Sequence, residues 1–432
     1  MALARFFSKP ILLSVTVLGI ILSFLGYFNP ISLPMMTFDM MSISFGFLAL
    51  LVTLIGFLIY VGSQDVLVSE WVHPVALLIF ATAGAMVMIS WSHLLILFLG
   101  IEILSIPFYA LAASHVTNAR SQESGIKYFL MGAVASAIFL FGMALYFAGT
   151  GLFVLDPMVV AAQVYTGDLV SLSGIFMMMA GLAFKAGFVP FHAWVADVYE
   201  GAPTVFVGWM AALVKVAIFA TFLRFLMPLF PIFQSWGAFL GLCCIFTMFL
   251  GNGLALFQTS LKRLFAYSGI AHAGYLCLAL LPATPVSVPT ILVYVCAYLL
   301  SILGVMWVIL LLEKQGLSDD FSSLNGLWRR SPFVFSILML SVFSMAGIPP
   351  LAGFFAKLGL VLHPMENGFM ILSLMAFINF FIGIAYYGRV LLAAATSKLE
   401  LSPILPSRLM FFSGILILLF QVLISIASLY IL

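Results

Sequence analysis

Long apolar runs follow one another along the whole chain, separated by short segments that hold most of the charged residues. A helix needs about 20 apolar residues to cross the hydrocarbon core of a bilayer. The runs do not alternate in polarity, which favours helices over the strands of a β-barrel. The sequence therefore predicts an all-α integral membrane protein with about thirteen transmembrane helices, at 10–28, 40–62, 73–91, 93–114, 126–150, 169–195, 203–228, 234–257, 261–283, 287–313, 332–362, 368–395 and 409–431.

The first run could be either a signal peptide or a helix. Arg5 and Lys9 precede the apolar stretch, as positive residues precede the apolar region of a signal peptide. The stretch is long, and no clear small-residue cleavage site follows it. It is therefore predicted to be an uncleaved first helix.

The composition agrees with a protein solvated by lipid. Of 432 residues, 65% are hydrophobic and 7% are charged, whereas a soluble domain carries roughly 25% charged residues. So few charges cannot cover the surface of a soluble protein. The net charge of +2 does not indicate a nucleic-acid partner or an acidic protein partner.

The cysteines give no sign of a metal or redox site. They lie inside apolar runs without the spacing of metal ligands, and are expected to be small buried hydrophobic residues: Cys243, Cys244, Cys277 and Cys296. The chain also has no phosphate-binding loop after a strand, no haem attachment motif and no cluster-binding set of cysteines. No cofactor or metal is therefore expected on this chain.

The basic residues give an orientation. The chain has 16 lysines and arginines, and three of them lie in the middle of predicted spans. Among the others only Arg224 falls on one side of the thirteen-span arrangement, and the rest fall on the opposite side: Arg5, Lys9, Arg120, Lys127, Lys262, Arg263, Lys314, Arg329, Arg330, Arg389, Lys398 and Arg408. Because loops rich in Lys and Arg stay in the cytoplasm, the N-terminus is predicted to be cytoplasmic and the C-terminus periplasmic.

Five titratable residues lie near the middle of predicted spans: Glu102, Lys185, Lys215, His272 and Lys357. A charge at the centre of a bilayer costs roughly 2.5–3.5 kcal/mol on insertion scales. These side chains should therefore face the protein interior and contact one another or water. A static ion pair between Glu102 and one lysine is the alternative, but one acid cannot neutralise three lysines. At least one lysine is expected to exchange its proton, which makes the row a candidate proton path.

Two predicted spans contain prolines close to a buried lysine. Pro190 follows Lys185 by five residues, and Pro349 and Pro350 precede Lys357. Proline removes a backbone donor and clashes with the preceding turn, so both helices are predicted to be broken. Paired broken helices indicate the ion site of a transporter built from inverted repeats, although an ordinary kink is the alternative at each break.

The spacing of these residues supports an internal repeat. Glu102 and Lys185 are 83 residues apart, and His272 and Lys357 are 85 apart. The equivalent residues lie five spans apart, and an odd number of spans inverts the second unit in the membrane. The predicted organisation is N-terminal helices over 1–72, five-helix repeats over 73–228 and 234–395, and a C-terminal loop and helix over 396–432.

These residues and their surroundings resemble subunit N of bacterial NADH-quinone oxidoreductase, the counterpart of mitochondrial subunit 2. The likeness runs from about residue 70 to 395. The matching stretches are GIEILSIPFYALAAS at 100–114, ESGIKYFLMGAVASA at 123–137, FKAGFVPFHAWVADVYEGAPT at 184–204, SLKRLFAYSGIAHAGYL at 260–276 and AGIPPLAGFFAKL at 346–358. The stretch at 197–203 distinguishes subunit N from its paralogues and from multi-subunit sodium/proton antiporters.

The resemblance implies a role for each member of the row. Glu102 looks like the essential glutamate of the family, paired with Lys185. Lys215 resembles the bridging lysine of the next helix, and His272 the link between two half-channels. Lys357 resembles the terminal lysine, which exchanges protons with one side of the membrane. Glu102 lies on the fourth predicted span instead of the family's fifth, so the family's first helix is expected to be missing.

The implied function is that of a proton-translocating, antiporter-like subunit of respiratory complex I, which couples NADH-to-quinone electron transfer to proton pumping. Flavin, iron–sulfur clusters and quinone are then expected on partner subunits. Subunits K and M are expected as neighbours, in the inner membrane of a bacterium. Some charged residues at helix ends are candidates for proton-uptake paths, although such charges are more often simply solvated: Glu123, Asp197, Arg263 and Arg389.

Several other functions remain open. A subunit of an Mrp-type cation/proton antiporter would share the fold and the buried lysines. So would a subunit of a ferredoxin- or hydrogenase-linked membrane complex. A non-pumping subunit, whose buried charges only hold helices together, is the alternative from another class. A small-solute carrier is disfavoured, because no span offers a hydrophilic solute cavity beyond the titratable row.

Overall fold

The computed structural model describes residues 16–20, 22–23, 26, 33–63, 68–396 and 402–431. Most of the predicted span 10–28 lies outside these residues. The described part of the chain is almost entirely helical. In chain order its elements are α2 (Met40–Ser63), α3 (Val68–Ser90), α4 (Leu94–Ala112), α5 (Ala119–Thr150), α6 (Pro157–Thr166), α7 (Leu169–Ala186), α8 (Ala193–Gly201), α9 (Thr204–Leu226), the 3₁₀ turn η2 (Met227–Leu229), α10 (Phe230–Leu256), α11 (Leu261–Leu280), α12 (Ser287–Lys314), the 3₁₀ turn η3 (Phe321–Leu324), α13 (Leu327–Arg330), α14 (Pro332–Ala346), α15 (Ala352–Glu366), α16 (Met370–Ala395) and α17 (Arg408–Ile431).

Ten helices of the described part are long and apolar enough to cross a membrane, which makes the chain a multi-pass membrane protein. Of the other predicted spans, 332–362 is divided into the short helices α14 and α15. The span 261–283 is the 20-residue helix α11, whose apolar sequence is interrupted by Lys262, Arg263 and His272. The predicted count of thirteen spans therefore stays a prediction.

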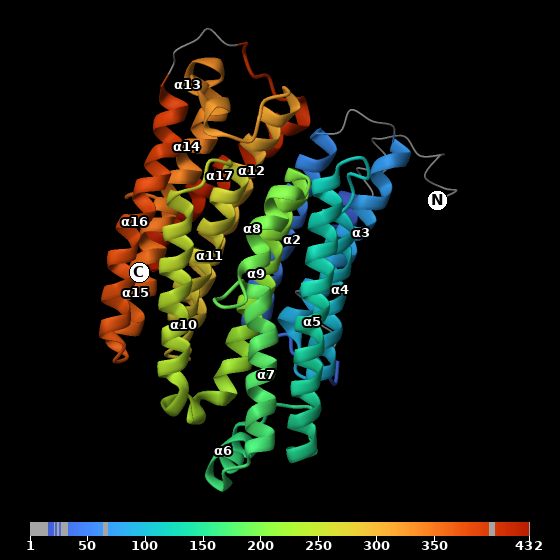
Figure 1. The fold of residues 1–432 in the computed structure, drawn as a ribbon, viewed down its shortest axis with the longest axis vertical. Coiled ribbons are helices and arrows are strands. Elements are labelled where there is room, and N and C mark those ends of the chain that lie inside the picture. The colour runs from blue at the N-terminus through green and yellow to red at the C-terminus, as the bar shows by residue number, and fades with distance from the viewer. Residues whose placement is uncertain are drawn as a thin grey trace.

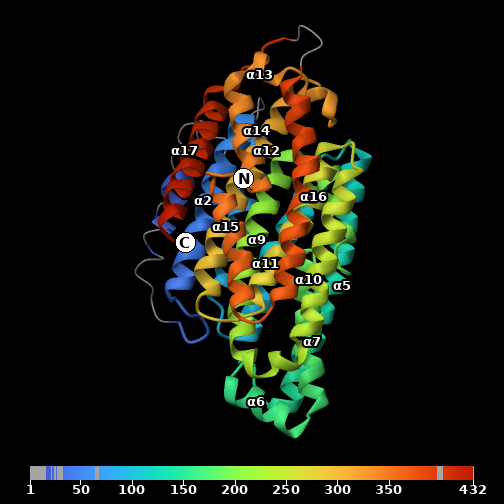
Figure 2. The ribbon, with the colours of Figure 1, turned by 90° about the vertical axis from the view of Figure 1, so that its left-hand side faces the viewer.

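The long helices run side by side along one axis (Figures 1 and 2). The helices α9 and α12 form the centre of the bundle. From Thr204 to Leu226 every residue of α9 except Arg224 is buried. Helices that are apolar on all sides belong in a protein interior, and α9 packs against α2, α3 and α12. In contrast, α5 and α16 expose large apolar side chains, among them Phe129 and Phe381.

The two ends of the bundle differ in charge. Arg329 and Arg330 lie on α13, at the upper end in Figure 1, whereas α6 lies at the lower end. The turn η2, which directly follows the last turn of α9 with Arg224, packs against α6. Arg224 forms an ion pair with Asp39 of 2.8 Å. The basic residue that the sequence assigned to the opposite side therefore lies near the α6 end.

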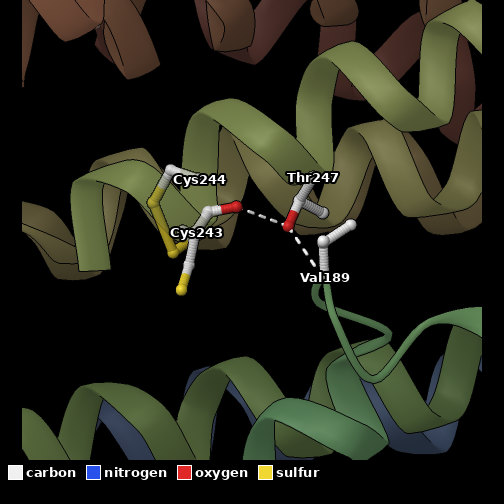
Figure 3. Close-up of a disulfide and its surroundings, with 5 residues drawn as sticks. Val189, Cys243, Cys244 and Thr247 are labelled. Atoms are coloured by element: carbon white, nitrogen blue, oxygen red, sulfur yellow. Dashed lines mark hydrogen bonds between the residues drawn. A yellow bond between two sulfur atoms is a disulfide. The ribbon is translucent and has the colours of Figure 1, made fainter. Parts of the chain in front are cut away.

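The expectation for the cysteines is wrong for one pair. Cys244 on α10 and Cys277 on α11 form a disulfide, with 5.6 Å between their Cα atoms (Figure 3). The two helices are successive and packed against each other, which brings the Cα atoms into the range that a disulfide requires. Cys296 is a buried free thiol, as expected, and Cys243 is a partly buried free thiol.

Candidate functional site

Both predicted helix breaks are present and are built alike. α7 ends at Ala186 and α14 ends at Ala346, and each is followed by a glycine in the left-handed conformation, Gly187 and Gly347. A cis proline follows each glycine, at Val189–Pro190 and at Pro349–Pro350. The left-handed φ of +79° at Gly347 favours glycine. Each broken helix therefore places several irregular residues inside the bundle.

Hydroxyl groups from distant helices satisfy the backbone at both breaks. The Val189 amide donates to Thr247 Oγ1 of α10 at 3.0 Å (Figure 3). The Ala352 amide, at the start of α15, donates to Ser425 Oγ of α17 at 2.9 Å. Non-helical backbone at membrane depth requires such protein partners. Thr247 and Ser425 could not be singled out from the sequence, since both look like ordinary small polar residues of an apolar helix.

Lys185 lies in the last turn of α7, before the first break, and is 5% exposed. Its Nζ donates to Ser105 Oγ at 2.5 Å and to Tyr109 Oη at 2.9 Å, both on α4. Glu102, on the same helix, is half-buried and accepts a hydrogen bond from Ser136 Oγ of α5 at 2.5 Å.

The direct Glu102–Lys185 pair implied by the resemblance is not formed. Within the described part of the chain, all ion pairs of 4.0 Å or less involve other residues. The Lys185 ammonium instead donates to Ser105 and Tyr109, which follow Glu102 by three and seven residues on the same face of α4.

Lys215 lies at the middle of α9 and is 7% exposed. Its Nζ donates to the carbonyl oxygen of Gly269 on α11 at 2.8 Å and lies 5.3 Å from the ring centroid of Tyr298 on α12. A cavity of about 20 Å³ is lined by both Lys185 and Lys215. A water needs roughly 10–15 Å³, so this cavity has room for about one water between the two lysines.

His272 follows Gly269 by three residues on α11 and is buried between tyrosines. Its Nδ1 lies 2.6 Å from Tyr294 Oη, and its Nε2 lies 2.9 Å from Tyr387 Oη. Tyr387 in turn lies 2.5 Å from Ser268 Oγ. Both ring nitrogens therefore have a hydroxyl that can donate or accept, which suits a group that changes its protonation.

Lys357 lies on α15, past the second break, and its side chain folds back towards that break. Its Nζ donates to the carbonyl oxygen of Ala346, the last residue of α14, at 3.1 Å. A helix C-terminus carries partial negative charge, which favours a cation there. A cavity of about 10 Å³ is lined by His272 and Lys357 and by Tyr298. The four basic groups of the predicted row are thus buried and follow one another across the bundle.

A buried polar cluster lies beside this row. Asn252 Nδ2 donates to Tyr275 Oη at 2.8 Å, Tyr275 Oη donates to Asn379 Oδ1 at 3.0 Å, and Tyr386 Oη donates to Asn252 Oδ1 at 2.8 Å. The Lys357 Nζ lies 5.5 Å from the ring centroid of Tyr275. Nothing in the sequence marks this cluster, because amide and phenol side chains are uncharged and do not stand out in an apolar run.

The charges at the α13 end form a network. Asp197 pairs with Lys127 at 3.0 Å and with Arg263 at 2.8 Å, Glu123 pairs with Lys127 at 2.7 Å, and Glu200 pairs with Arg263 at 2.8 Å. These residues, some of them candidates for proton uptake, hold α5, α8 and α11 together. Arg389 instead donates to the Leu256 carbonyl oxygen.

A cavity of about 560 Å³ opens beside this network. Lys262 at its wall is 9% exposed and lies 3.4 Å from Glu313. Burial raises the pKa of the Asp319 carboxyl, against the opposing effect of the hydrogen bond from Ser260. Across the described ranges no group of three His, Cys, Asp or Glu side chains could hold a metal ion.

Comparison with known proteins identifies the family. The family described as NADH:quinone oxidoreductase/Mrp antiporter, TM, matches residues 92–383. NADH-quinone oxidoreductase subunit N of Flavobacterium psychrophilum is 36% identical over 373 residues, which cover 85% of this chain and 80% of the relative.

Solved structures share the fold. A chain in respiratory complex I from Thermus thermophilus with bound aureothin has a TM-score of 0.84 and 29% identity, covering 99% of this chain and 94% of that chain. A chain of the membrane-bound sulfane sulfur reductase, an archaeal respiratory membrane complex, has a TM-score of 0.85 and 22% identity, covering 99% and 91% of the two chains. At that identity the second likeness shows the fold alone. The resemblance found from sequence motifs is confirmed, and the chain belongs to the family of NADH-quinone oxidoreductase subunit N, an antiporter-like membrane subunit of respiratory complex I.

Proposed function

We propose that this subunit conducts protons along Glu102, Lys185, Lys215, His272 and Lys357 as its part in coupling NADH-to-quinone electron transfer to proton pumping. The observation that carries the proposal is that small cavities lie between buried titratable groups at two steps of the row. One cavity joins Lys185 to Lys215, and another joins His272 to Lys357. Because each has room for about one water, protons can pass between groups that do not touch.

The switch at the Glu102 end involves Ser105. In the present arrangement Lys185 donates to Ser105 and Tyr109, and Glu102 accepts from Ser136. A negative charge that develops near Glu102 would draw the Lys185 ammonium away from Ser105, and the loss of that charge would release the Lys185 proton towards Lys215. The two arrangements of Lys185 form the two-state element that such coupling requires.

The magnitudes permit this mechanism. Moving one charge against 100 mV costs about 2.3 kcal/mol. A hydrogen bond to a charged group contributes about 1.5–3 kcal/mol. Breaking or forming one hydrogen bond at a lysine therefore involves an energy similar to that of moving a proton against the membrane potential.

The proposed surroundings follow from the half-buried Glu102. Exposed Ile103 and Ile106 flank it on α4, so the carboxyl lies at a surface that faces lipid or a partner. A carboxylate facing lipid at this depth is costly, and we propose that a neighbouring subunit covers this face. Subunits K and M are the proposed neighbours, and flavin, iron–sulfur clusters and quinone would be held by partner subunits.

The proposed topology is a bacterial inner-membrane protein with about thirteen spans. Two inverted repeats would cover 73–228 and 234–395, flanked by N-terminal helices over 1–72 and a C-terminal segment over 396–432. Two features support the repeats. Each contains a glycine-capped break followed by a cis proline. Each break also receives a hydroxyl from the second span after it, α10 in one case and α17 in the other.

The test is the proton-to-electron ratio of the assembled complex in membrane vesicles. Lys215→Ala and Glu102→Ala are expected to lower this ratio strongly, because each removes a carrier that no neighbour replaces. Arg408→Ala serves as the control, since Arg408 is an exposed cation at the start of α17 and should leave the ratio unchanged. An unchanged ratio in both row variants would sink these role assignments.

A non-pumping structural subunit predicts a different result. If the buried charges only held helices together, Lys357→Met would leave pumping intact in an assembled complex. An Mrp-type antiporter subunit, or a subunit of a ferredoxin- or hydrogenase-linked complex, predicts different partners. Mass spectrometry of the intact native complex distinguishes these from a complex I that contains subunits K and M.

A further inference from the structure

Lys215 and His272 are not joined by a hydrogen bond, and neither of the two small cavities described above is lined by both residues. Lys215 donates to the Gly269 carbonyl oxygen, and His272 contacts Tyr294 and Tyr387. A helix carbonyl cannot carry a proton onward. Another group must therefore link the two if protons pass through both.

Tyr298 of α12 lies between Lys215 and His272. The Lys215 Nζ lies 5.3 Å from its ring centroid, and the ring centroids of Tyr298 and His272 are 5.0 Å apart. Tyr298 also lines the cavity shared by His272 and Lys357. The side chain is 3% exposed, so it contacts both halves of the row from within the protein.

The hydroxyl of Tyr298 has no hydrogen-bond partner among the protein groups of the described chain, although it is buried. A buried polar group without a partner costs about 1–3 kcal/mol. If Tyr298 served only for packing, phenylalanine would fill the same space without this cost. The other three tyrosines around His272, which are Tyr275, Tyr294 and Tyr387, all use their hydroxyls. The free hydroxyl at this position points to a water-bridged contact.

The position of Gly269 explains how the hydroxyl reaches the row. A Cβ atom at residue 269 would lie 3.0 Å from Tyr298 Oη and 4.0 Å from Lys215 Cε. A Cβ atom there would displace the hydroxyl by a few tenths of an ångström, so glycine permits this close approach. Lys215, Gly269 and Tyr298 thus come together where α9, α11 and α12 pack against one another.

We propose that the Tyr298 hydroxyl positions the water that transfers a proton between Lys215 and His272. This inference rests on the proposed function of the row. In one transfer, the Lys215 ammonium gives a proton to the water and the water gives a proton to a His272 ring nitrogen. Lys215 loses one proton and His272 gains one, while Tyr298 stays neutral and keeps its O–H bond. Tyr298 is therefore a positioning residue of the proton path.

The test compares Tyr298→Phe with Tyr146→Phe in the assembled complex. Tyr146 is equally buried but donates to the Val154 carbonyl oxygen on the α5 side, away from the row. Loss of one hydrogen bond to the transferring water should slow proton pumping by about tenfold in Tyr298→Phe. The solvent deuterium isotope effect on pumping should rise at the same time, because proton transfer becomes limiting. Tyr146→Phe should show neither change.

Gly269→Ala supplies a second variant that keeps the Lys215 acceptor. It should slow pumping by displacing the Tyr298 hydroxyl, and this effect should shrink in the Tyr298→Phe background, where the displaced oxygen is absent. Equal effects of Gly269→Ala in both backgrounds would overturn the assignment of Tyr298. So would a Tyr298→Phe complex that pumps and responds to deuterium like Tyr146→Phe.

Lys215→Ala separates the two levels of the argument. If Lys215→Ala abolishes pumping while Tyr298→Phe pumps at the normal rate, the row stands and the role of Tyr298 is wrong. If Lys215→Ala pumps normally, the proposed row is wrong and the role of Tyr298 falls with it.

Discussion

Each of the three buried lysines donates from its ammonium to a different kind of neutral acceptor. Lys185 uses two hydroxyls, Lys215 uses a helix carbonyl, and Lys357 uses the last carbonyl of a broken helix. A carboxylate partner would fix the charge in place. Neutral acceptors stabilise the ammonium less, so they let a lysine lose its proton more readily. This chemistry suits carriers better than a static ion pair would.

Tyr109 offers a direct test of this interpretation. Tyr109→Phe removes one of the two hydroxyls that accept from Lys185, and a hydrogen bond to a charged group contributes about 1.5–3 kcal/mol. With one acceptor fewer, the ammonium form of Lys185 is less stabilised and less populated, so the rate of proton transfer through Lys185 should fall by about tenfold. Proton uptake by vesicles, measured beside NADH oxidation, checks this. Tyr146→Phe is again the control, and equal pumping in the two variants would show that Tyr109 only packs against its neighbours.

The titratable residues of the row could be predicted from sequence because a charged residue inside an apolar run is costly and therefore conspicuous. Their neutral partners could not be found in this way. Ser105 and Tyr109 follow Glu102 at helical spacing, but serine and tyrosine are common in membrane helices. Tyr298 comes from α12, and only the packing of α12 on α9 and α11 brings it to Lys215. The direct Glu102–Lys185 ion pair was expected without knowledge of these neutral partners, and Lys185 donates to Ser105 and Tyr109 instead.

At the scale of elements, the sequence predicts where the two helices break but not which contacts hold each break in place. Pro190 and the pair Pro349 and Pro350 indicate the breaks from sequence alone. What holds each break in place is a hydroxyl from α10 or α17, and nothing local in the sequence links a threonine in one apolar run to an amide 58 residues away. The disulfide between α10 and α11 was missed for the same reason, as it depends on which helices are neighbours.

Thr247→Val tests the anchoring of the first break. Valine keeps the shape of threonine but leaves the buried Val189 amide without an acceptor, which should destabilise the complex by about 1–3 kcal/mol. Thermal inactivation of the detergent-solubilised complex should therefore occur at a lower temperature. Thr290→Val is the matched control, because the Thr290 hydroxyl bonds only the Val286 carbonyl oxygen of its own helix turn. Equal inactivation temperatures would contradict the role of Thr247.

Ser425→Ala should have the same effect at the second break, where the Ala352 amide loses its acceptor. The same thermal assay applies, with Ser336→Ala as control, since Ser336 bonds only the Pro332 carbonyl oxygen of its own helix. If only the Thr247 variant were destabilised, the two breaks would not be equivalent in energy, and the argument for a repeat would lose one of its two supports.

For the whole molecule, the distribution of charge and the fold agree on which residues share an end. The ion-pair network joins α5, α8 and α11 and the polar cavity lies beside it, whereas Arg224 lies next to η2, which packs against α6. The helices α13 and α6 lie at opposite ends of the bundle (Figure 1). The basic residues predicted this division, because the charges between spans can be counted from the sequence without knowledge of helix packing. It could not supply the arrangement of the helices around α9 and α12, which depends on contacts between distant segments.

The orientation in the membrane follows if lysine- and arginine-rich ends stay in the cytoplasm. Single cysteines at Ser318, exposed beside the polar cavity, and at Tyr165, 94% exposed on α6, then face opposite compartments. A membrane-impermeant thiol reagent should label Ser318→Cys only in inside-out vesicles and Tyr165→Cys only in right-side-out vesicles, with the native chain giving the background. Reversed labelling would invert the orientation and exchange the sides of proton uptake and release. Labelling of both cysteines from one side would mean that an even number of spans lies between them. The two proposed halves of the proton path would then not be inverted relative to each other.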